Sequence, residues 1–188
     1  MQIWAGLGNP GASYALQRHN VGFMIADLLA ELYDFGPWQK KFRSLIAEGR
    51  IDGHRVLLIK PQTFMNDSGD AVQQALHFYK LEPDSLTVFH DELDLAPMKM
   101  KVKTGGGTAG HNGLRSVGAA IGPDFRRVRI GIGHPGHKDR VTNYVLGNYA
   151  KGELEPLTDL LGAIAAEAPL LAADDDTAFM NQVALRLG

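Results

Sequence analysis

The feature that most restricts the fold of this chain is the alternation of short apolar runs with longer helical patterns. QIWAGLG (2–8) is an apolar run that ends at the turn residues NPG (9–11), which is typical of a buried strand. From Val21 the apolar residues follow helical spacing as far as the Gly-Pro pair at 36–37, where a helix stops. Strands that alternate with helices predict an α/β fold with parallel strands in its sheet.

The later segments predict a hairpin and further strands of the same sheet. SLIAEGRIDGHRVLLIKP (44–61) contains two strand patterns joined by Asp-Gly at 52–53, a strong hairpin signal. An apolar stripe over 71–79 predicts a helix through about Lys80, capped by Asn66 or Ser68. Further expected elements are strands at 86–94, 98–103 and 127–133, a helix at about 112–121, and helices from about Glu153 with an acidic break at 174–176. We expect residues 1–188 to form a single α/β domain with a mixed, largely parallel twisted sheet flanked by helices.

Composition excludes several function classes. The chain contains no cysteine, which excludes disulfides, thiolate metal sites and a cysteine nucleophile. Its formal net charge is −2, so a nucleic-acid partner would need a local basic patch. The N-terminus has no signal-peptide pattern, and the most apolar tract (160–173) is too short and too interrupted to span a bilayer. We therefore expect a cytoplasmic protein.

The glycine run GGGTAGHNG (105–113) raises the question of nucleotide binding. Gly105, Gly107 and Gly110 fit the dinucleotide spacing G-x-G-x-x-G, but no Walker lysine follows and a lone match is weak. The glycines can equally form a flexible loop with positive φ angles. They can also let the backbone approach a bulky substrate while His111 and Asn112 start a helix, where free N–H groups favour an anion.

Polar residues occur where several predicted strands end and helices begin. In an open α/β sheet, ligands bind outside the carboxyl ends of the strands. A histidine, a carboxylate and amide side chains that converge there would supply a base, its orienting partner and hydrogen-bond donors. Each residue alone also fits a cap or turn, whereas the set predicts a hydrolase that activates water without a covalent nucleophile. The set comprises Asn9, His19, Asn66, Asp91 and Asn112.

Two other kinds of active site find less support. HDELD (90–94), with His19 and His111, offers metal ligands, but no recognised ligand spacing occurs, so we expect no metal. A serine nucleophile lacks its G-x-S-x-G motif, and a role as helix cap accounts for Ser68.

Two alternating strands predict a local basic surface. In MKMKVK (98–103) the period of two places the three lysines on one face, and in RVRIGIG (127–133) it does the same for Arg127 and Arg129. If these strands are neighbours, a cationic face lies beside the glycine loop. Such a face can be merely solvated, or it can bind a phosphate-rich substrate.

The chain resembles the bacterial peptidyl-tRNA hydrolase family from Ile3 to about Gly147. The resemblance rests on six motifs that follow one another in uninterrupted order. They are GLGNPG (6–11), the HN of QRHNVGF (17–23), KPQTFMNDSG (60–69), HDELDL (90–95), GGGTAGHNGLRS (105–116) and FRRVRIGIGHP (125–135).

The resemblance implies cleavage of the ester between a peptide and the 3′-terminal ribose of tRNA, which recycles tRNA during translation. It implies a monomer without metal or cofactor, with His19 as base, Asp91 as its partner, and Lys103 and Arg129 as the residues that bind tRNA phosphate. The segment at about 136–150 is implied to be a movable lid over the cleft. The residues implied to contact substrate are Asn9, Tyr14, Phe64, Met65, Asn66, His111 and Asn112.

On this interpretation the glycine run is no nucleotide-cofactor loop, and it brings its backbone, His111 and Asn112 against the substrate. Two alternatives come from other classes: an RNA-binding module without catalysis, and a metal-dependent hydrolase of another ester. A binding module would leave the ester of a model peptidyl-tRNA intact, whereas a chelator would stop a metal enzyme.

Overall fold

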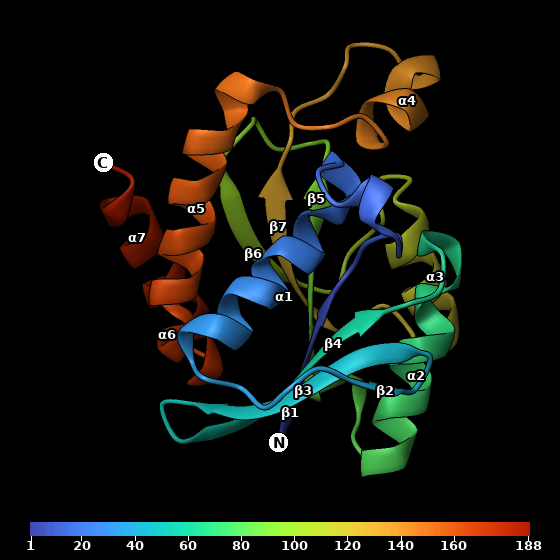
Figure 1. The fold of residues 1–188 in the computed structure, drawn as a ribbon, viewed down its shortest axis with the longest axis vertical. Helices are drawn as coiled ribbons and strands as arrows, with labels where there is room; N and C mark the ends of the chain where they lie inside the picture. Colours follow the sequence, from blue (N-terminus) through green and yellow to red (C-terminus); the bar gives the residue numbers. More distant parts are fainter.

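A seven-stranded mixed sheet with helices on both faces forms the molecule, as the sequence predicts (Figure 1). The structure, a computed structural model, describes all residues, 1–188. The strand order is β2-β3-β4-β1-β5-β7-β6. The strands that run parallel to one another are β1 (Gln2–Gly6), β4 (His54–Pro61), β5 (Leu86–Glu92) and β7 (Arg126–Gly131). Those that pair antiparallel to their neighbours are β2 (Gln39–Lys41), β3 (Ser44–Ile51) and β6 (Met100–Thr104).

Alternate residues of the buried strands pack into two separate hydrophobic cores, one on each face of the sheet. On β1, Trp4 belongs to one core and Ile3 to the other, because successive side chains point to opposite faces of a sheet. The core around Trp4 is covered by α1 (Val21–Leu32), α5 (Leu154–Ala166), α6 (Ala168–Ala172) and α7 (Asp176–Arg186). The opposite core is covered by α2 (Ser68–Tyr79) and α3 (Asn112–Ile121).

The carboxyl ends of the parallel strands point toward the top of Figure 1, where α4 (Val141–Val145) lies beyond the sheet. Helices α5 to α7 lie together on the left of this view, and α2 and α3 on the right. None of the helices combines the length and hydrophobicity that crossing a bilayer requires.

Most elements lie where the residue pattern predicts them. Asp52 and Gly53 both have positive φ angles, 50° and 80°, and join β3 to β4 in the expected hairpin. Helix α3 has the predicted bounds. Strand β6 begins at Met100 instead of Met98, because Met98 has a left-handed backbone with φ 64°. The short edge strand β2 was not predicted.

The predicted cap of α2 is wrong. The helix follows a 3-10 turn, Met65–Asp67, and neither Asn66 nor Ser68 accepts a hydrogen bond from its first N–H groups. The N–H of Gly69 donates to Oγ of Ser116 on α3 instead, at 2.9 Å. The hydroxyl of Ser68 instead donates to the carbonyl of Met65 at 2.7 Å. The amide of Asn66 is consequently not used as a cap.

Candidate active site

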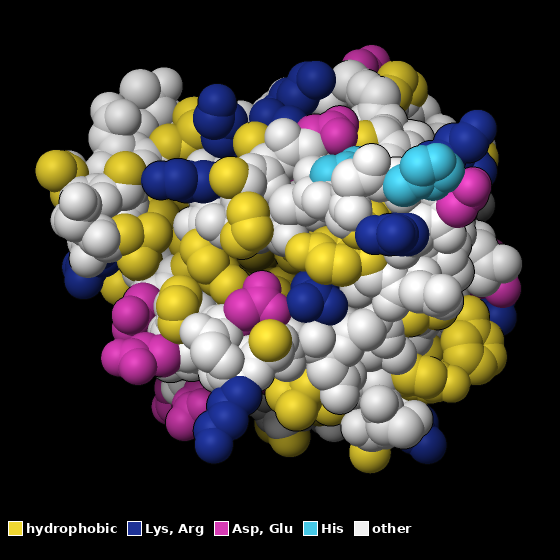
Figure 2. All heavy atoms as spheres, turned by 90° about the horizontal axis from the view of Figure 1, so that it is seen from above, with side chains coloured by type: hydrophobic (Ala, Val, Ile, Leu, Met, Phe, Trp, Pro, Cys, Tyr) yellow, Lys and Arg dark blue, Asp and Glu magenta, His cyan; other side chains and the backbone are white.

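A cleft of about 380 Å³ opens at the carboxyl ends of the parallel strands. Figure 2 looks onto this end of the molecule and shows hydrophobic side chains around a hollow near the middle of the face. The polar part of the lining comes from the end of β5, from the segments that follow β1 and β4, from the start of α3 and from Thr142 of α4. This is the position that parallel sheets offer to ligands.

A close approach of α1 to the sheet places His19 in this cleft. His19 lies in a 3-10 turn, Arg18–Asn20, directly before α1. Gly22, in the first turn of α1, packs so tightly that a Cβ there would lie 2.5 Å from the carbonyl oxygen of Phe89 and closer still to the backbone of Leu7. Only glycine allows the start of α1 to contact β1 and β5 at this point, and this contact brings His19 next to the end of β5.

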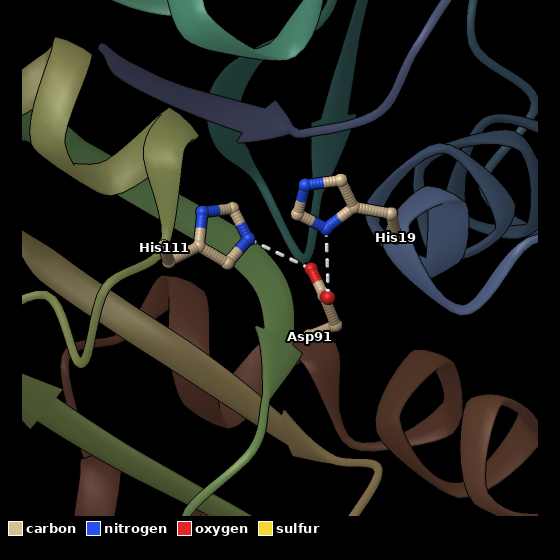
Figure 3. Close-up of side chains that lie close together, drawn as sticks. All are labelled: His19, Asp91 and His111. Carbon is tan, nitrogen blue, oxygen red and sulfur yellow. Dashed lines mark hydrogen bonds and ion pairs between the residues drawn. The ribbon is translucent and has the colours of Figure 1, made fainter. Parts of the chain in front are cut away.

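Two histidines bind one carboxylate at the centre of the cleft (Figure 3). The Nδ1 atom of His19 lies 2.8 Å from Oδ2 of Asp91, and Nε2 of His111 lies 2.7 Å from Oδ1 of the same carboxylate. The side chain of Asp91 is 2% exposed, and those of the two histidines are each 8% exposed. Both oxygens of a buried carboxylate are thus bound by ring nitrogens.

The carboxylate of Asp91 is ionised. Burial by itself raises the pKa of Asp91, but the two neighbouring histidines and their hydrogen bonds outweigh burial and hold the pKa well below its ordinary range. An ionised carboxylate only accepts hydrogen bonds, so each of the two ring nitrogens must carry a proton and donate it.

The two histidines differ in their second ring nitrogen. Nδ1 of His111 accepts hydrogen bonds from the backbone N–H groups of Gly113 and Leu114, at 3.1 and 3.2 Å, and so caps α3. His111 therefore has no free nitrogen. His19 lines the cleft, and its Nε2 atom makes no hydrogen bond. Of the two rings, only that of His19 offers a lone pair for a proton from water.

A third histidine on β5 stays neutral. Burial lowers the pKa of His90 to about 3, and its Nδ1 donates to the backbone carbonyl of Asp91 at 2.8 Å. Its Nε2 atom is buried without a partner. His90 does not line the cleft, and the one hydrogen bond of its ring is to the backbone at the end of β5.

The hydrogen bonds around Asn9 orient its side-chain amide. The backbone of Asn9 exchanges two hydrogen bonds with the side chain of Asn20, at 2.9 and 2.8 Å. The Oδ1 atom of Asn9 accepts from the backbone N–H of Met65 at 2.8 Å. Because the oxygen is occupied, the NH₂ group of Asn9 remains as the donor available in the cleft.

The histidine–aspartate cluster also has the composition of a metal site. One ligand atom from each of His19, Asp91 and His111 lies within 4.8 Å of the others. The N···O distances of 2.7 and 2.8 Å are those of direct hydrogen bonds, whereas two ligands of one zinc ion lie roughly 3.3 Å apart. Hydrogen bonding therefore accounts for all three side chains.

Comparison with known proteins shows the family of the chain. The family model of peptidyl-tRNA hydrolase matches residues 3–187. The chain belongs to the peptidyl-tRNA hydrolase family. A protein named peptidyl-tRNA hydrolase from Rhizorhabdus wittichii is 67% identical over 187 residues, covering 100% of this chain and 99% of the relative. The peptidyl-tRNA hydrolase of Novosphingobium aromaticivorans is 66% identical and covers 99% of this chain and 97% of its own.

A solved structure of a peptidyl-tRNA hydrolase has the same fold as this chain. The crystal structure of peptidyl-tRNA hydrolase from Acinetobacter baumannii superposes with a TM-score of 0.92 at 40% identity. The match covers 97% of this chain and 94% of that chain.

Most of the residues predicted to contact substrate line the cleft. Tyr14 is the exception among the predicted substrate contacts, because it lies in the 3-10 turn Ala12–Tyr14 and does not line the cavity. Lys103 and Arg129 lie outside the cavity on β6 and β7. The predicted residues that line the cleft are Asn9, His19, Phe64, Met65, Asn66, Asp91, His111 and Asn112.

The sequence analysis placed the segment at about 136–150 over the cleft, but it did not name the apolar residues that form a wall there. This wall is formed by Leu93, by Val141 and Val145 of α4, and by Leu146, and the 59% exposed Phe64 also lines the cleft. The spacing of four between the two valines was the available signal. The segment that carries them is attached to the site, because Arg18 donates to the carbonyl of Tyr144 and stacks on its ring at 4.2 Å.

Strands β6 and β7 are neighbours, so the predicted basic surface exists. Their register pairs Lys101 with Arg129 and Lys103 with Arg127. The expectation that both arginines present their charge on this face is wrong for Arg127, which is 2% exposed. Its guanidinium donates to the carbonyls of Gly106, Gly107 and Pro123, so it fixes the glycine loop from below. The Nη1 atom of Arg129 lies 3.6 Å from Oε1 of Glu92, and Lys103 is exposed.

Proposed function

We propose that the protein hydrolyses the ester between the peptide and the 3′-terminal ribose of peptidyl-tRNA, with water activated by His19 and Asp91 and without a covalent intermediate. The observation that carries this proposal is the unequal use of the ring nitrogens of His19. Nδ1 is held by a buried, ionised carboxylate, while Nε2 is free in the cleft of a chain that belongs to this family.

In this mechanism Nε2 of His19 removes a proton from water, and the resulting hydroxide attacks the ester carbonyl. Asp91 stabilises the imidazolium that forms and keeps the ring in the required tautomer. The amide of Asn66 or Asn112 donates to the oxyanion of the tetrahedral intermediate. When the intermediate collapses, the imidazolium returns its proton to the leaving ribose oxygen, so the base is regenerated.

The lining of the cleft favours water over a side chain as nucleophile. Thr142, on α4, supplies the one hydroxyl among the residues that line the cavity, and no hydrogen bond links it to His19. Ser68 is fully buried and donates to a backbone carbonyl. An activated serine or threonine would need a hydrogen bond to the base.

The decisive experiment compares N-acylated aminoacyl-tRNA with free aminoacyl-tRNA, each with and without a chelator. We expect the N-acylated substrate to be cleaved and the chelator to have no effect. An intact ester would favour a binding module, and loss of activity on chelation would favour a metal enzyme. We further propose a cytoplasmic monomer that uses no cofactor, which sedimentation of the purified protein and cell fractionation would test.

We propose that Lys103 and Arg129 bind phosphate groups of the tRNA. A chain with net charge −2 attracts RNA poorly as a whole, so its contact with phosphate must come from a local basic surface. These two side chains lie on adjacent strands beside the glycine loop and outside the cleft.

Lys103→Ala and Arg129→Ala should raise KM for peptidyl-tRNA and leave kcat largely unchanged. Each lost phosphate contact should reduce the slope of log affinity against log salt by roughly 0.7 to 0.9. An N-acylated amino acid on the terminal adenosine alone should respond to neither substitution, because it lacks the distant phosphates. Equal losses on the long and the short substrate would show that these residues act at the ester or in the fold.

Gly106→Ala should imitate the loss of Lys103. The side chain of Lys103 crosses the glycine loop at this point, and a Cβ on residue 106 would lie 2.5 Å from its ammonium nitrogen. Displacing that ammonium should raise KM for peptidyl-tRNA by roughly threefold to tenfold. Gly107→Ala is the matched control, because its Cβ would meet no atom within 4 Å. Alanine at position 106 also strains the backbone, because φ is +97° there, and the melting temperatures of both variants measure that strain. Equal KM values for Gly106→Ala and Gly107→Ala would contradict the prediction.

A further inference from the structure

We infer that His111 is a positioning residue that shares the Asp91 carboxylate with His19 and thereby sets the pH above which His19 acts as a base. This inference rests on the proposed function. It concerns a ring that contacts no reacting atom in the mechanism above and acts only through the carboxylate.

The ring of His111 is held in one orientation by the start of α3. Its Nδ1 accepts from the N–H groups of Gly113 and Leu114, the second and third residues of α3. The positive end of a helix disfavours a cation at this position. Protonation of Nδ1 would also break both hydrogen bonds. The ring is thus held neutral, with its single proton on Nε2.

The two oxygens of the Asp91 carboxylate are divided between the two rings. His111 donates to Oδ1 of Asp91 at 2.7 Å, and His19 donates to Oδ2 at 2.8 Å. A hydrogen bond to one oxygen draws charge away from the other, because the carboxylate is delocalised. The imidazolium form of His19 is consequently stabilised less than it would be by an Asp91 carboxylate with no second donor.

Other charged and titratable groups near the pair do not compensate for this division. His90, whose ring centroid lies 5.2 Å from that of His111, is neutral because burial lowers its pKa to about 3. Burial raises the pKa of Tyr149 far above neutral pH, so it is neutral too. Glu92 is paired with Arg129, and Arg18 with Glu153. His111 is therefore the one neighbour that donates to the same carboxylate as His19.

Two substitutions separate the two bonds of His111. Asparagine is a preferred N-cap whose oxygen can replace Nδ1, but its side chain is too short to reach Asp91. Glutamine can place its NH₂ group near the position of Nε2 and donate to Asp91, but it does not reproduce the cap. His111→Asn therefore keeps the helix cap and loses the donor, and His111→Gln does the reverse.

The test is the pH dependence of kcat/KM for peptidyl-tRNA in the wild type and both variants. His111→Asn should move the acidic limb to higher pH by roughly 0.5 to 1 pH unit, because the full carboxylate then stabilises the imidazolium. His111→Gln should leave the limb in place, although its melting temperature falls. A limb that stays in place in His111→Asn, or that moves equally in both variants, would overturn the inference.

A second readout does not require turnover. Nitrogen NMR of the histidine rings should show His111 protonated on Nε2 and unchanged through the titration of His19, whose midpoint should rise in His111→Asn. If the wild type fails to cleave peptidyl-tRNA, the proposed function fails, while the NMR titration still tests the coupling of the two rings. If it cleaves and the His19 midpoint does not move, the inference on His111 fails alone.

Discussion

His19→Ala should lower kcat by about 10²- to 10⁴-fold, the usual cost of removing a general base, while peptidyl-tRNA remains bound. The ring supplies the one nitrogen of the histidine–aspartate cluster without a hydrogen bond in the structure. The phosphate contacts proposed for Lys103 and Arg129 lie outside the cleft and do not involve this ring. Single-turnover hydrolysis and a filter-binding assay on the same variant measure the two effects.

The control for His19→Ala is His19→Asn. Alanine leaves Asp91 with one donor, so part of its effect can come from a disturbed carboxylate. Asparagine can still donate its NH₂ group to Oδ2 of Asp91, near the position of Nδ1, but has no basic nitrogen. Both variants should be equally inactive. Near-normal turnover in either would remove His19 from the mechanism.

The sequence predicts the parts of the fold that depend on local pattern. The hairpin at Asp52-Gly53 follows from the positive φ angles that such a turn requires, and α3 follows from its apolar period. The cap of α2 could not be predicted, because a side chain with capping chemistry can equally bond the preceding turn, as Ser68 does. The edge strand β2 depends on pairing with β3, and its own residues show no strand pattern.

The sequence predicted which residues converge on the candidate site, but it did not predict all of the hydrogen bonds between them. The convergence of Asn9, His19 and Asp91 on one edge follows from the parallel sheet. The second histidine on Asp91 does not follow from the sequence, because it requires the cap geometry of α3. The burial of Arg127 could not be predicted either, because it depends on the path of the glycine loop, whose carbonyls accept hydrogen bonds from the guanidinium.

Asp91→Asn should lower kcat by about 10²- to 10⁴-fold, because it changes the tautomer of His19 as well as removing a charge. Asparagine offers one oxygen and one NH₂ group where two ring N–H groups now donate. The ring of His111 is locked by the first turn of α3, so the oxygen of the asparagine must face His111. The NH₂ group then faces Nδ1 of His19 and forces the proton of that ring onto Nε2, the nitrogen that must accept it from water.

A second substitution distinguishes a change of tautomer from loss of charge alone. In the double variant Asp91→Asn, His111→Asn, the ring that fixed the orientation of residue 91 is gone. The asparagine at position 91 can then turn its oxygen toward Nδ1 of His19 and restore the active tautomer. We expect the double variant to be more active than Asp91→Asn itself, with kcat measured on the same peptidyl-tRNA at saturating concentration. Ring nitrogen NMR of His19 should show the proton on Nε2 in the single variant and on Nδ1 in the double variant. If the two substitutions multiply their losses instead, the tautomer of His19 is not set through His111, and the effect of Asp91 is that of its charge.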